Sequence, residues 1–322
     1  MIVINAGLLS SASTWTVNVI HAVLAQDAAR PTFRTFADTL QTVPRQERDC
    51  HLLFKSHHPH ADFRLLAQAR AAKFVITLRD PRDCVASLMQ RFGRTFEQAL
   101  VNTSSSLAHL DAVPAGDALV LRYEDRFFER SETIRAIAGF LEVGGCDQAF
   151  CERTAARFSI DEVTRLVACI PDMPTGSTTR YSDSIAHNET GFHTGHITDA
   201  RSGKFAERLS ADEISIIEAV TAHSASKFGY ALDPGVLPGT LFRHDGDARA
   251  SPKFHLAAGE WKARFVADEI FSCKIHANGS PVVSGRSGAA LGFLVEAPSH
   301  AVELRINVEP TGTFHHAQLS RL

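Results

Sequence analysis

A lysine and a histidine stand two positions apart in the segment FKSHHP, residues 54–59, at the end of an apolar run. Side chains alternate along a strand, so Lys55 and His57 are expected on the same face. A lysine can neutralise an anionic group while it is transferred, and a histidine can take a proton from a hydroxyl near neutral pH. The spacing therefore indicates a group-transfer pair, with a solvated strand end as the structural alternative.

A second candidate site follows the opening apolar run MIVINAG. The segment LLSSASTWTVN, residues 8–18, places small and hydroxyl-bearing residues before a helical pattern, with no lysine and no glycine after Gly7. Free N–H groups and the dipole at a helix N-terminus attract anions. The segment indicates either an anion-binding loop or a serine-rich helix cap. Its side chains with polar or aromatic groups are Ser10, Ser11, Ser13, Thr14 and Trp15.

The third segment is LRDPRDCVAS, residues 78–87. Arg79 ends an apolar strand, and Ser87 stands eight positions later, about two turns into the expected helix. A guanidinium and a hydroxyl can hold one phosphate from two sides, although a salt-bridged helix start would look the same. All three segments fall at expected strand-to-helix junctions, where α/β proteins bind their ligands.

Together these segments resemble the sulfotransferases that use 3′-phosphoadenosine 5′-phosphosulfate (PAPS). LSSASTW aligns with the family's loop, which is close to Pro-Lys-Ser-Gly-Thr-Thr-Trp, and KSHHP with Lys-Thr-His-Leu-Pro. LRDPRDCVASLMQRF is similar to Arg-Asn-Pro-Lys-Asp-x-x-x-Ser. Residues 121–143 resemble the Tyr-Glu-Asp strand and Phe-Leu-Gly helix, and residues 196–218 resemble the C-terminal segment of bacterial members. Five degenerate motifs in the family's order cover roughly residues 1–230.

The resemblance implies a role for each matching residue. His57 would be the general base that deprotonates the acceptor hydroxyl, and Lys55 would stabilise the sulfuryl group as it moves in line between two oxygens. PAPS would be the donor and adenosine 3′,5′-bisphosphate (PAP) the product, with no metal; Trp15 would stack on adenine. The implied nucleotide contacts are Ser10, Ser11, Ala12, Ser13, Thr14 and Trp15 in the loop, Arg79 and Ser87 at the 3′-phosphate, and Arg201, Ser202, Gly203 and Lys204 in the closing segment.

Two loop positions depart from the family's pattern. Ser10 stands where the family has a lysine, and Ala12 where it has a glycine. That lysine normally meets the bridging oxygen of the leaving group, and losing such a donor costs about 2–4 kcal/mol of transition-state stabilisation. Either Lys55 or a basic residue from residues 171–208 takes over this role, or the protein binds nucleotide with little or no turnover. The retained Lys55 and His57 favour activity.

The elements that position these residues follow from the pattern of apolar residues. Residues 1–232 alternate strand and helix patterns and predict an α/β domain with a P-loop-like parallel sheet in three layers. The polar stretch 171–208 is expected to be either a functional lid or disordered. Its histidines, His187, His193 and His196, are taken as ordinary loop residues, with contacts to the acceptor as the lesser alternative. The expected strands are 1–6, 51–56, 73–80 and 117–125, and the helices 13–26, 80–92, 131–143, 147–170 and 210–230, the last with a Ser210–Glu213 capping box.

The pattern changes after a Pro/Gly linker at residues 233–240. Short alternating segments then predict a β-sandwich-like accessory domain over residues 241–322, with strands separated by the turn signals ANGS and PTGT. Trp261 lies in one of these segments, either as core or as a stacking platform for a saccharide. The sequence therefore predicts two domains, 1–232 and 241–322.

Composition limits the function classes. The net charge of −3 over 322 residues gives no global basic field, so nucleic acid is not an expected partner. The six cysteines lack CxxC spacing and are expected to be reduced thiols. No signal-peptide pattern and no apolar run of ~18–20 residues occurs, which predicts a cytoplasmic protein without a membrane span.

These observations favour a sulfotransferase that moves a sulfuryl group from PAPS to a hydroxyl or amine. Analogy with bacterial members suggests a carbohydrate or glycolipid acceptor, and a small phenol or alcohol is the main rival. The alternative is a non-catalytic PAPS/PAP-binding or interaction protein, because Ser10 replaces the loop lysine. A kinase is disfavoured, since the Gly-Lys-Ser/Thr that cradles β- and γ-phosphates is absent.

Overall fold

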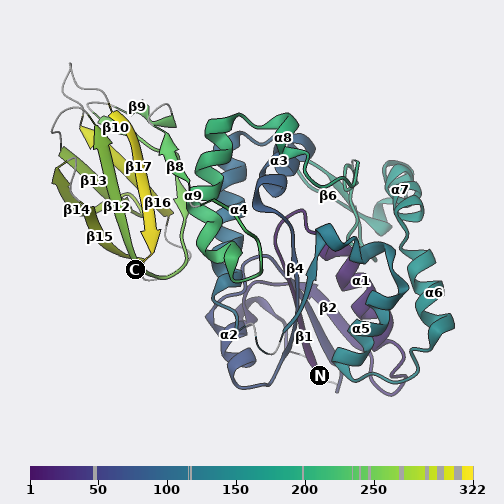
Figure 1. The fold of residues 1–322 in the computed structure, drawn as a ribbon. Helices are drawn as coiled ribbons and strands as arrows, with labels where there is room; N and C mark the ends of the chain where they lie inside the picture. Colours follow the sequence, from purple (N-terminus) through teal and green to yellow (C-terminus); the bar gives the residue numbers. More distant parts are fainter. Residues whose placement is uncertain are drawn as a thin grey trace. The chain divides into compact units, whose positions relative to one another are not determined.

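The computed structural model forms two compact units (Figure 1). The first holds Met1–Asp80, Gln90–Gly93 and Val113–Ser202, and the second holds Pro81–Met89, Arg94–Ala112 and Gly203–Leu322. The domain boundaries at 232 and 241 stay predictions. The residues that the structure describes are 1–45, 49–114, 116, 118–197, 199–233, 235–238, 241–245, 248–267, 272–286, 290–295, 301–307 and 314–321.

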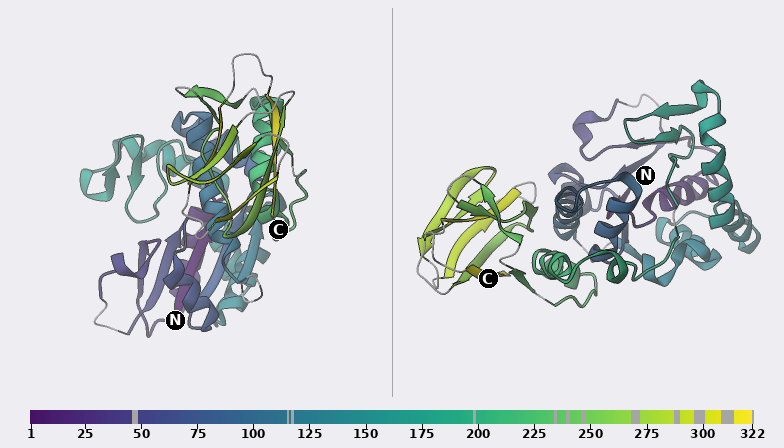
Figure 2. Two further views of the ribbon diagram at one scale, coloured as in Figure 1. Left: turned by 90° about the vertical axis from the view of Figure 1, so that its left-hand side faces the viewer. Right: turned by 90° about the horizontal axis from the view of Figure 1, so that it is seen from above.

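A five-stranded parallel sheet forms the centre of the first unit (Figures 1 and 2). Its order is β2-β3-β1-β4-β5, and Ile4 of the central strand pairs with Phe54 on one side and Phe74 on the other. The predicted parallel sheet is confirmed, with one strand, β2, that the sequence analysis missed. The strands are β1 (Ile2–Gly7), β2 (Thr32–Phe36), β3 (His51–Ser56), β4 (Lys73–Leu78) and β5 (Ala118–Arg122).

Helices cover both faces of this sheet. Leu53 on one face belongs to the same core as Ile20 of α1 and Ile137 of α5, whereas Phe54 on the other face stacks on Phe63 of α2 at 5.3 Å between ring centroids. The three-layer α/β fold class is confirmed. The helices of this unit are α1 (Ser13–Leu24), α2 (Ala61–Gln68), α5 (Ser131–Leu141), α6 (Gln148–Arg157) and α7 (Ile160–Cys169).

The segment expected to be a lid is ordered around short elements. Its part in the first unit, residues 171–202, contains the hairpin β6 (Thr178–Arg180) and β7 (Ile185–His187). Asn18 of α1 donates a hydrogen bond to the Thr190 carbonyl at 2.8 Å. We call residues 171–202 the lid segment; its backbone is tied to the helix that follows the loop.

Helices and antiparallel strands build the second unit. It contains α3 (Pro81–Phe92) up to Met89, α4 (Phe96–Asp111), α8 (Phe205–Arg208) and α9 (Ala211–Ser226). The capping box between Ser210 and Glu213 is confirmed at the start of α9. α4 begins with a second capping box, formed by Thr95 and Gln98.

The predicted antiparallel strands form two sheets in the order β14-β13-β16-β10-β9, with β11 beside β16, and β15-β12-β17-β8. The ANGS turn joins β13 to β14, and Asn278 and Gly279 have positive φ there; PTGT and part of the 233–240 linker lie outside the described residues. The strands are β8 (Val236–Pro238), β9 (Arg243–Asp245), β10 (Ala248–Ala250), β11 (Phe254–His255), β12 (Gly259–Ala267), β13 (Ser272–Ala277), β14 (Ser280–Arg286), β15 (Ala290–Val295), β16 (Ala301–Asn307) and β17 (Phe314–Arg321).

Candidate active site

The loop between β1 and α1 turns tightly against β4. A Cβ on Gly7 would collide with the Thr77 hydroxyl and with Cβ of Ser13, so only glycine fits there. The Ser11 hydroxyl lies 3.0 Å from the Thr77 carbonyl and 2.5 Å from the Leu8 carbonyl. The hydroxyl of Ser11 therefore holds the loop to the sheet.

The backbone of this loop presents donors at the start of α1. Because the helix begins at Ser13, the N–H groups of Ser13, Thr14 and Trp15 have no intrahelical acceptor. The N–H of Ser11 is different, since it donates to the Leu8 carbonyl at 3.2 Å. The free donors and the helix dipole together make the start of α1 suitable for an anion.

Lys55, in β3, places its ammonium group at this helix start. Its Nζ donates to the Thr14 hydroxyl at 2.6 Å. Burial, with smaller contributions from Arg91 and Arg34, lowers the pKa of Lys55 to about 8. Among the residues that the structure describes, no carboxylate lies within ion-pair distance of this amine. It is a desolvated cation without a protein counter-ion.

His57 follows β3 and turns its imidazole toward the loop. Nδ1 lies 2.5 Å from the Gly7 carbonyl. A carbonyl can only accept, so this contact assigns the proton to Nδ1 and the lone pair to Nε2. Burial and then the charge of Lys55 lower the pKa of His57 to about 3, against the opposing hydrogen bond to Gly7. The ring is therefore neutral at pH 7, and Nε2 can accept a proton.

Asp38 fixes the turn that carries His57, and the sequence analysis missed it. Its Oδ1 accepts hydrogen bonds from the Ser56 hydroxyl at 2.7 Å and from the amides of His57 and His58 at 3.0 Å each. Burial acts to raise the pKa of Asp38, but the bonds from His58 and Ser56 outweigh it and hold the pKa well below its usual range. Asp38 follows the unpredicted strand β2, so no sequence signal located it.

Arg91 is a further cation at the loop that the sequence analysis did not select. Its guanidinium donates to the Gly195 carbonyl at 3.0 Å and to the Ser10 hydroxyl at 3.4 Å. Burial, followed by the charge of Arg79, lowers the pKa of Arg91 to about 10. Its position four residues after Ser87, about one helical turn, is the signal that could have found it.

Arg79 also lies beside the loop. Its guanidinium stands over the Tyr123 ring at 4.2 Å and donates to the carbonyls of Ser10 at 3.3 Å and Arg201 at 2.6 Å. Ser87 is buried on α3, in the second unit. The two members of the predicted phosphate clasp thus belong to different units, and the clasp stays a prediction.

The closing segment is divided in the same way. Arg201 and Ser202 are exposed and belong to the first unit, where the Arg201 side chain pairs with Asp199 at 3.4 Å. Lys204 is buried in the second unit, and the N–H of Gly203 donates to a carboxylate oxygen of Asp83 at 2.7 Å. The Gly203 amide is therefore already engaged by protein.

Trp15 is placed differently from the expectation that it stacks on adenine. The ring is 5% exposed and packs edge-on against Phe127 at 5.7 Å between centroids. Its indole N–H donates to the Phe158 carbonyl at 3.0 Å. Because packed side chains already surround the ring, Trp15 anchors α1 in the core, and we leave it out of the nucleotide contacts proposed below.

Two histidines of the lid segment pack against each other and are influenced by the charges of Arg91 and Lys55. The rings of His193 and His196 lie 4.3 Å apart between centroids. Burial lowers the pKa of His193 to about 4 and that of His196 well below its ordinary value, and the charges of Arg91 and Lys55 add to both shifts. Both rings are neutral at pH 7. Within the described residues, no cluster of three or more potential metal ligands occurs.

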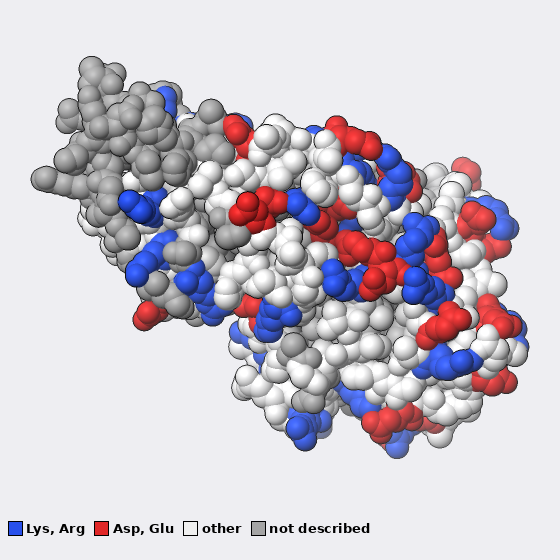
Figure 3. Space-filling view, in the orientation of Figure 1, with Lys and Arg blue, Asp and Glu red and all other residues white. Residues whose placement is uncertain are grey.

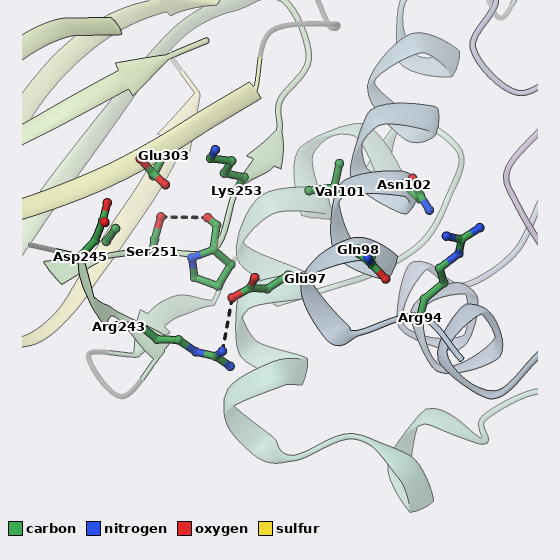
Figure 4. Close-up of a pocket in the computed structure, with 12 residues that line it drawn as sticks. Arg94, Glu97, Gln98, Val101, Asn102, Arg243, Asp245, Ser251, Lys253 and Glu303 are labelled. Atoms are coloured by element: carbon green, nitrogen blue, oxygen red, sulfur yellow. Dashed lines mark hydrogen bonds and ion pairs between the residues drawn. The ribbon is translucent and has the colours of Figure 1, made fainter. Parts of the chain in front are cut away.

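The surface does not mark this site by charge alone. On the face drawn in Figure 3, acidic and basic side chains are interspersed. A hollow of about 560 Å³ lies in the second unit, between α4 and strands of the β-sheets (Figure 4). Its carboxylates are already paired, Glu97 with Arg243 at 3.7 Å and both Asp245 and Glu303 with Arg305 at 2.8 and 2.6 Å.

Comparison with known proteins agrees with the geometry. Residues 6–144 match the Sulfotransferase family, and this segment contains the loop, Lys55, His57, Arg79 and Ser87. This match supports the resemblance inferred from the motifs over residues 6–144. The described sheet and helices form an α/β fold.

The chain was also compared with curated proteins and with solved structures. A search of curated proteins finds no match. Among solved structures, the chain is similar to mouse sulfotransferase SULT7A1 complexed with PAP, with 11% identity, 71% of this chain and 89% of that chain covered, and a TM-score of 0.47. The resemblance to sulfotransferases is supported by the family match over residues 6–144 and by the topology of the central sheet. Of the described helices, none combines the length and the apolar character that crossing a bilayer requires.

Proposed function

We propose that the protein is a sulfotransferase that transfers a sulfuryl group from PAPS to a hydroxyl or amine. One observation carries the proposal. Two half-buried cations, Lys55 and Arg91, lie at a loop with free N–H donors, and neither has a carboxylate partner among the described residues. A partly desolvated charge without a counter-ion is stabilised by an anion, so the site is suited to an anionic ligand.

The reaction follows from this arrangement. The N–H groups of Ser13 and Thr14 hold the 5′-phosphate end of the donor. The acceptor oxygen forms a new bond to sulfur while the bond from sulfur to the bridging oxygen breaks, and that electron pair stays on the 5′-phosphate of PAP. The acceptor's proton goes to Nε2 of His57, and Lys55 neutralises charge on the moving group.

The 3′-phosphate is the part of the donor that separates PAPS from ATP. We propose that Arg79 and Ser87 hold it, assisted by Arg201, Ser202 and Lys204, as the resemblance implies. Arg79 is already fixed at the loop by the carbonyls of Ser10 and Arg201, so its guanidinium needs no large movement to meet a ligand. Charge-assisted bonds of this kind are the strong hydrogen bonds of phosphate recognition.

The acceptor we propose is an alcohol on a carbohydrate or glycolipid. Phe36 supports an acceptor with an apolar ring face, because it is 58% exposed and its ring lies 5.8 Å from the His57 ring between centroids. A phenol would use the same face, and an acceptor screen separates the two. Trp261 offers no platform, since it is 2% exposed and donates to the Ala257 carbonyl at 2.9 Å.

A non-catalytic nucleotide-binding protein is the second candidate. The observation that favours it is Ser10 at the loop position where the resemblance places a lysine. Such a protein would bind PAP like the enzyme but would release no sulfuryl group from PAPS to any acceptor. The placement of His57, neutral and with Nε2 as the acceptor nitrogen, favours the enzyme.

Calorimetric titration of the protein with PAP, AMP and ATP tests the proposal. PAP is expected to bind at least about tenfold more tightly than AMP, because one charge-assisted bond to the 3′-phosphate contributes about 1.5–3 kcal/mol. Lys55→Ala is expected to weaken PAP binding, and Lys262→Ala, on strand β12, serves as the charge-matched control. Equal binding of AMP and PAP, or no binding of either, would contradict the proposal.

A further inference from the structure

We propose that Arg91 is a second loop cation, which binds the phosphosulfate together with Lys55 and replaces a charge that the loop itself lacks. The inference rests on the proposed function and names an additional residue of the same site. It starts from the fact that the loop, residues 8–12, contains no basic side chain. Any cation at its N-terminal half must therefore come from another element.

The geometry brings Arg91 to that half of the loop. Its Nη1 donates to the Ser10 hydroxyl at 3.4 Å, whereas the amine of Lys55 reaches Thr14 at 2.6 Å. Ser10 precedes α1 and Thr14 lies in its first turn. Arg91 therefore contacts the middle of the loop, and Lys55 contacts the first turn of α1, where the free N–H groups lie.

The charges of these two side chains are not balanced by protein. Arg91 contacts the Gly195 carbonyl, the Ser10 hydroxyl and the ring of Phe92, and within the described part of the chain none of its contacts is a carboxylate. Its charge lowers the pKa of Lys55, and Arg79 lowers the pKa of Arg91 in turn. Like charges held this close repel one another unless an anion lies between them. A phosphosulfate at the loop supplies that anion.

A purely structural role is the rival explanation. The bond from Nε to the Gly195 carbonyl also fixes the lid segment, and a neutral donor would do this equally well. The two roles differ in what they require of residue 91. Anion binding requires a positive charge, whereas fixing the lid segment requires only an N–H group. Arg91→Gln keeps an N–H group and removes the charge, so it separates the two.

The experiment measures PAP affinity by calorimetry, together with thermal unfolding, for the full-length protein and its variants. Arg91→Ala and Arg91→Gln are each expected to weaken PAP binding at least tenfold, while Arg91→Lys retains most of the affinity. Adding Ser10→Lys to Arg91→Gln is expected to restore binding, because it returns a charge to the same part of the loop. Arg165→Ala removes a charge that is 70% exposed and paired with Glu162, and should change nothing.

The outcomes separate this inference from the proposed function. Wild-type affinity in Arg91→Gln would overturn the inference and leave the proposed function intact. A weakening in Arg91→Gln that Ser10→Lys does not reverse, with an unfolding temperature lowered as in Arg91→Ala, would assign Arg91 to holding the lid segment and would also overturn it. Failure of the wild-type protein to bind PAP would instead remove the proposed function.

Discussion

At the scale of single residues, the loop stores backbone strain at a position where the resemblance expects glycine. Ala12 has φ +61° and Ser10 has φ +66°, both in the left-handed region. A residue with a Cβ costs roughly 1–2 kcal/mol there, whereas glycine does not. Glycine also makes the unfolded chain more flexible, which offsets part of the gain. Ala12→Gly is therefore expected to raise the free energy of unfolding by about 0.5–1 kcal/mol, measured by denaturant titration.

Ala22→Gly is the matched control for this prediction, because Ala22 lies inside the same helix. Glycine in a helix interior costs about 0.5–1 kcal/mol, so this variant should be destabilised. If Ala12→Gly raises the free energy of unfolding and Ala22→Gly lowers it, the backbone at Ala12 is strained. Destabilisation of both variants by the same amount would contradict it.

The ionisation of Lys55 and His57 predicts the pH dependence of turnover. The pKa of Lys55 is about 8 and that of His57 is about 3. Lys55 is charged below its pKa and His57 is neutral above its own, so kcat/KM should be level from about pH 5 to about pH 8 and fall above it. Lys55→Arg should remove the alkaline fall, since arginine stays charged.

His57→Ala completes this test in the same assay. It should lower kcat by about 10²–10⁴ and leave PAP affinity unchanged, since the base acts on the acceptor. His60→Ala changes an exposed histidine in the same segment and serves as the control. Unchanged turnover in His57→Ala would contradict the assignment of His57 as the base. A fall of the wild-type kcat/KM below about pH 6.5 would contradict the low pKa of His57.

These residues also show how far the sequence predicts the site. Lys55 and His57 could be predicted because their chemistry and spacing are local. Arg91 and Asp38 could not, since each reaches the site through contacts far away in the sequence, Arg91 with Ser10 and Asp38 with the amides after β3. Local motifs therefore identify the reacting groups, and tertiary contacts add the groups that charge and position them.

At the scale of elements, the predicted strands are those with continuous apolar runs. β1, β3 and β4 are buried at most positions and were predicted. β2 lies at the edge of the sheet, has no fully buried residue and carries a polar sequence, TFRTF, so periodicity did not detect it. An edge strand with partial burial has a weak pattern by its nature.

The helices show a second limit of periodicity. α4 was missed because its sequence, FEQALVNTSSSLAHLD, is rich in hydroxyl-bearing residues that favour caps and turns. Ser104 and Ser106 are nevertheless buried there, and Ser104 accepts a hydrogen bond from the amide of His255 at 3.0 Å. The region 147–170, predicted as one helical region, is two helices, because Ser159 caps a new start at Ile160. Both differences come from side chains that bond to the backbone.

At the scale of the whole molecule, a net charge of −3 coexists with a local cationic site. On the face in Figure 3, acidic and basic side chains are interspersed. The site depends instead on short-range features: free N–H groups at the start of α1, and the charges of Lys55 and Arg91. This explains why composition alone excluded nucleic acid yet gave no indication of a nucleotide.

In the second unit, helix α9 connects the other helices to the β-strands. α9 packs against α4 on one side and against β8 and β17 on another, and its residues Ile216 and Val220 are buried. The Ser215 hydroxyl donates to the Val236 carbonyl at 2.6 Å. The sequence predicted a boundary at residue 232, which would leave α9 on one side of the cut and β8 on the other. In the structure α9 packs directly against β8 within the second unit.

Truncation after residue 232 tests this arrangement. Removing the β-strands would expose buried side chains of α4 and α9, and each 100 Å² of apolar surface is worth about 2.5 kcal/mol. The fragment 1–232 is therefore expected to unfold at least about 5 °C below the full chain, or to aggregate, in a thermal-shift measurement. A fragment that matched the full chain in unfolding temperature and in PAP affinity would show an independent accessory domain, as the sequence predicted. A destabilised fragment would instead mean that the β-strands help to build the sulfotransferase-like part itself.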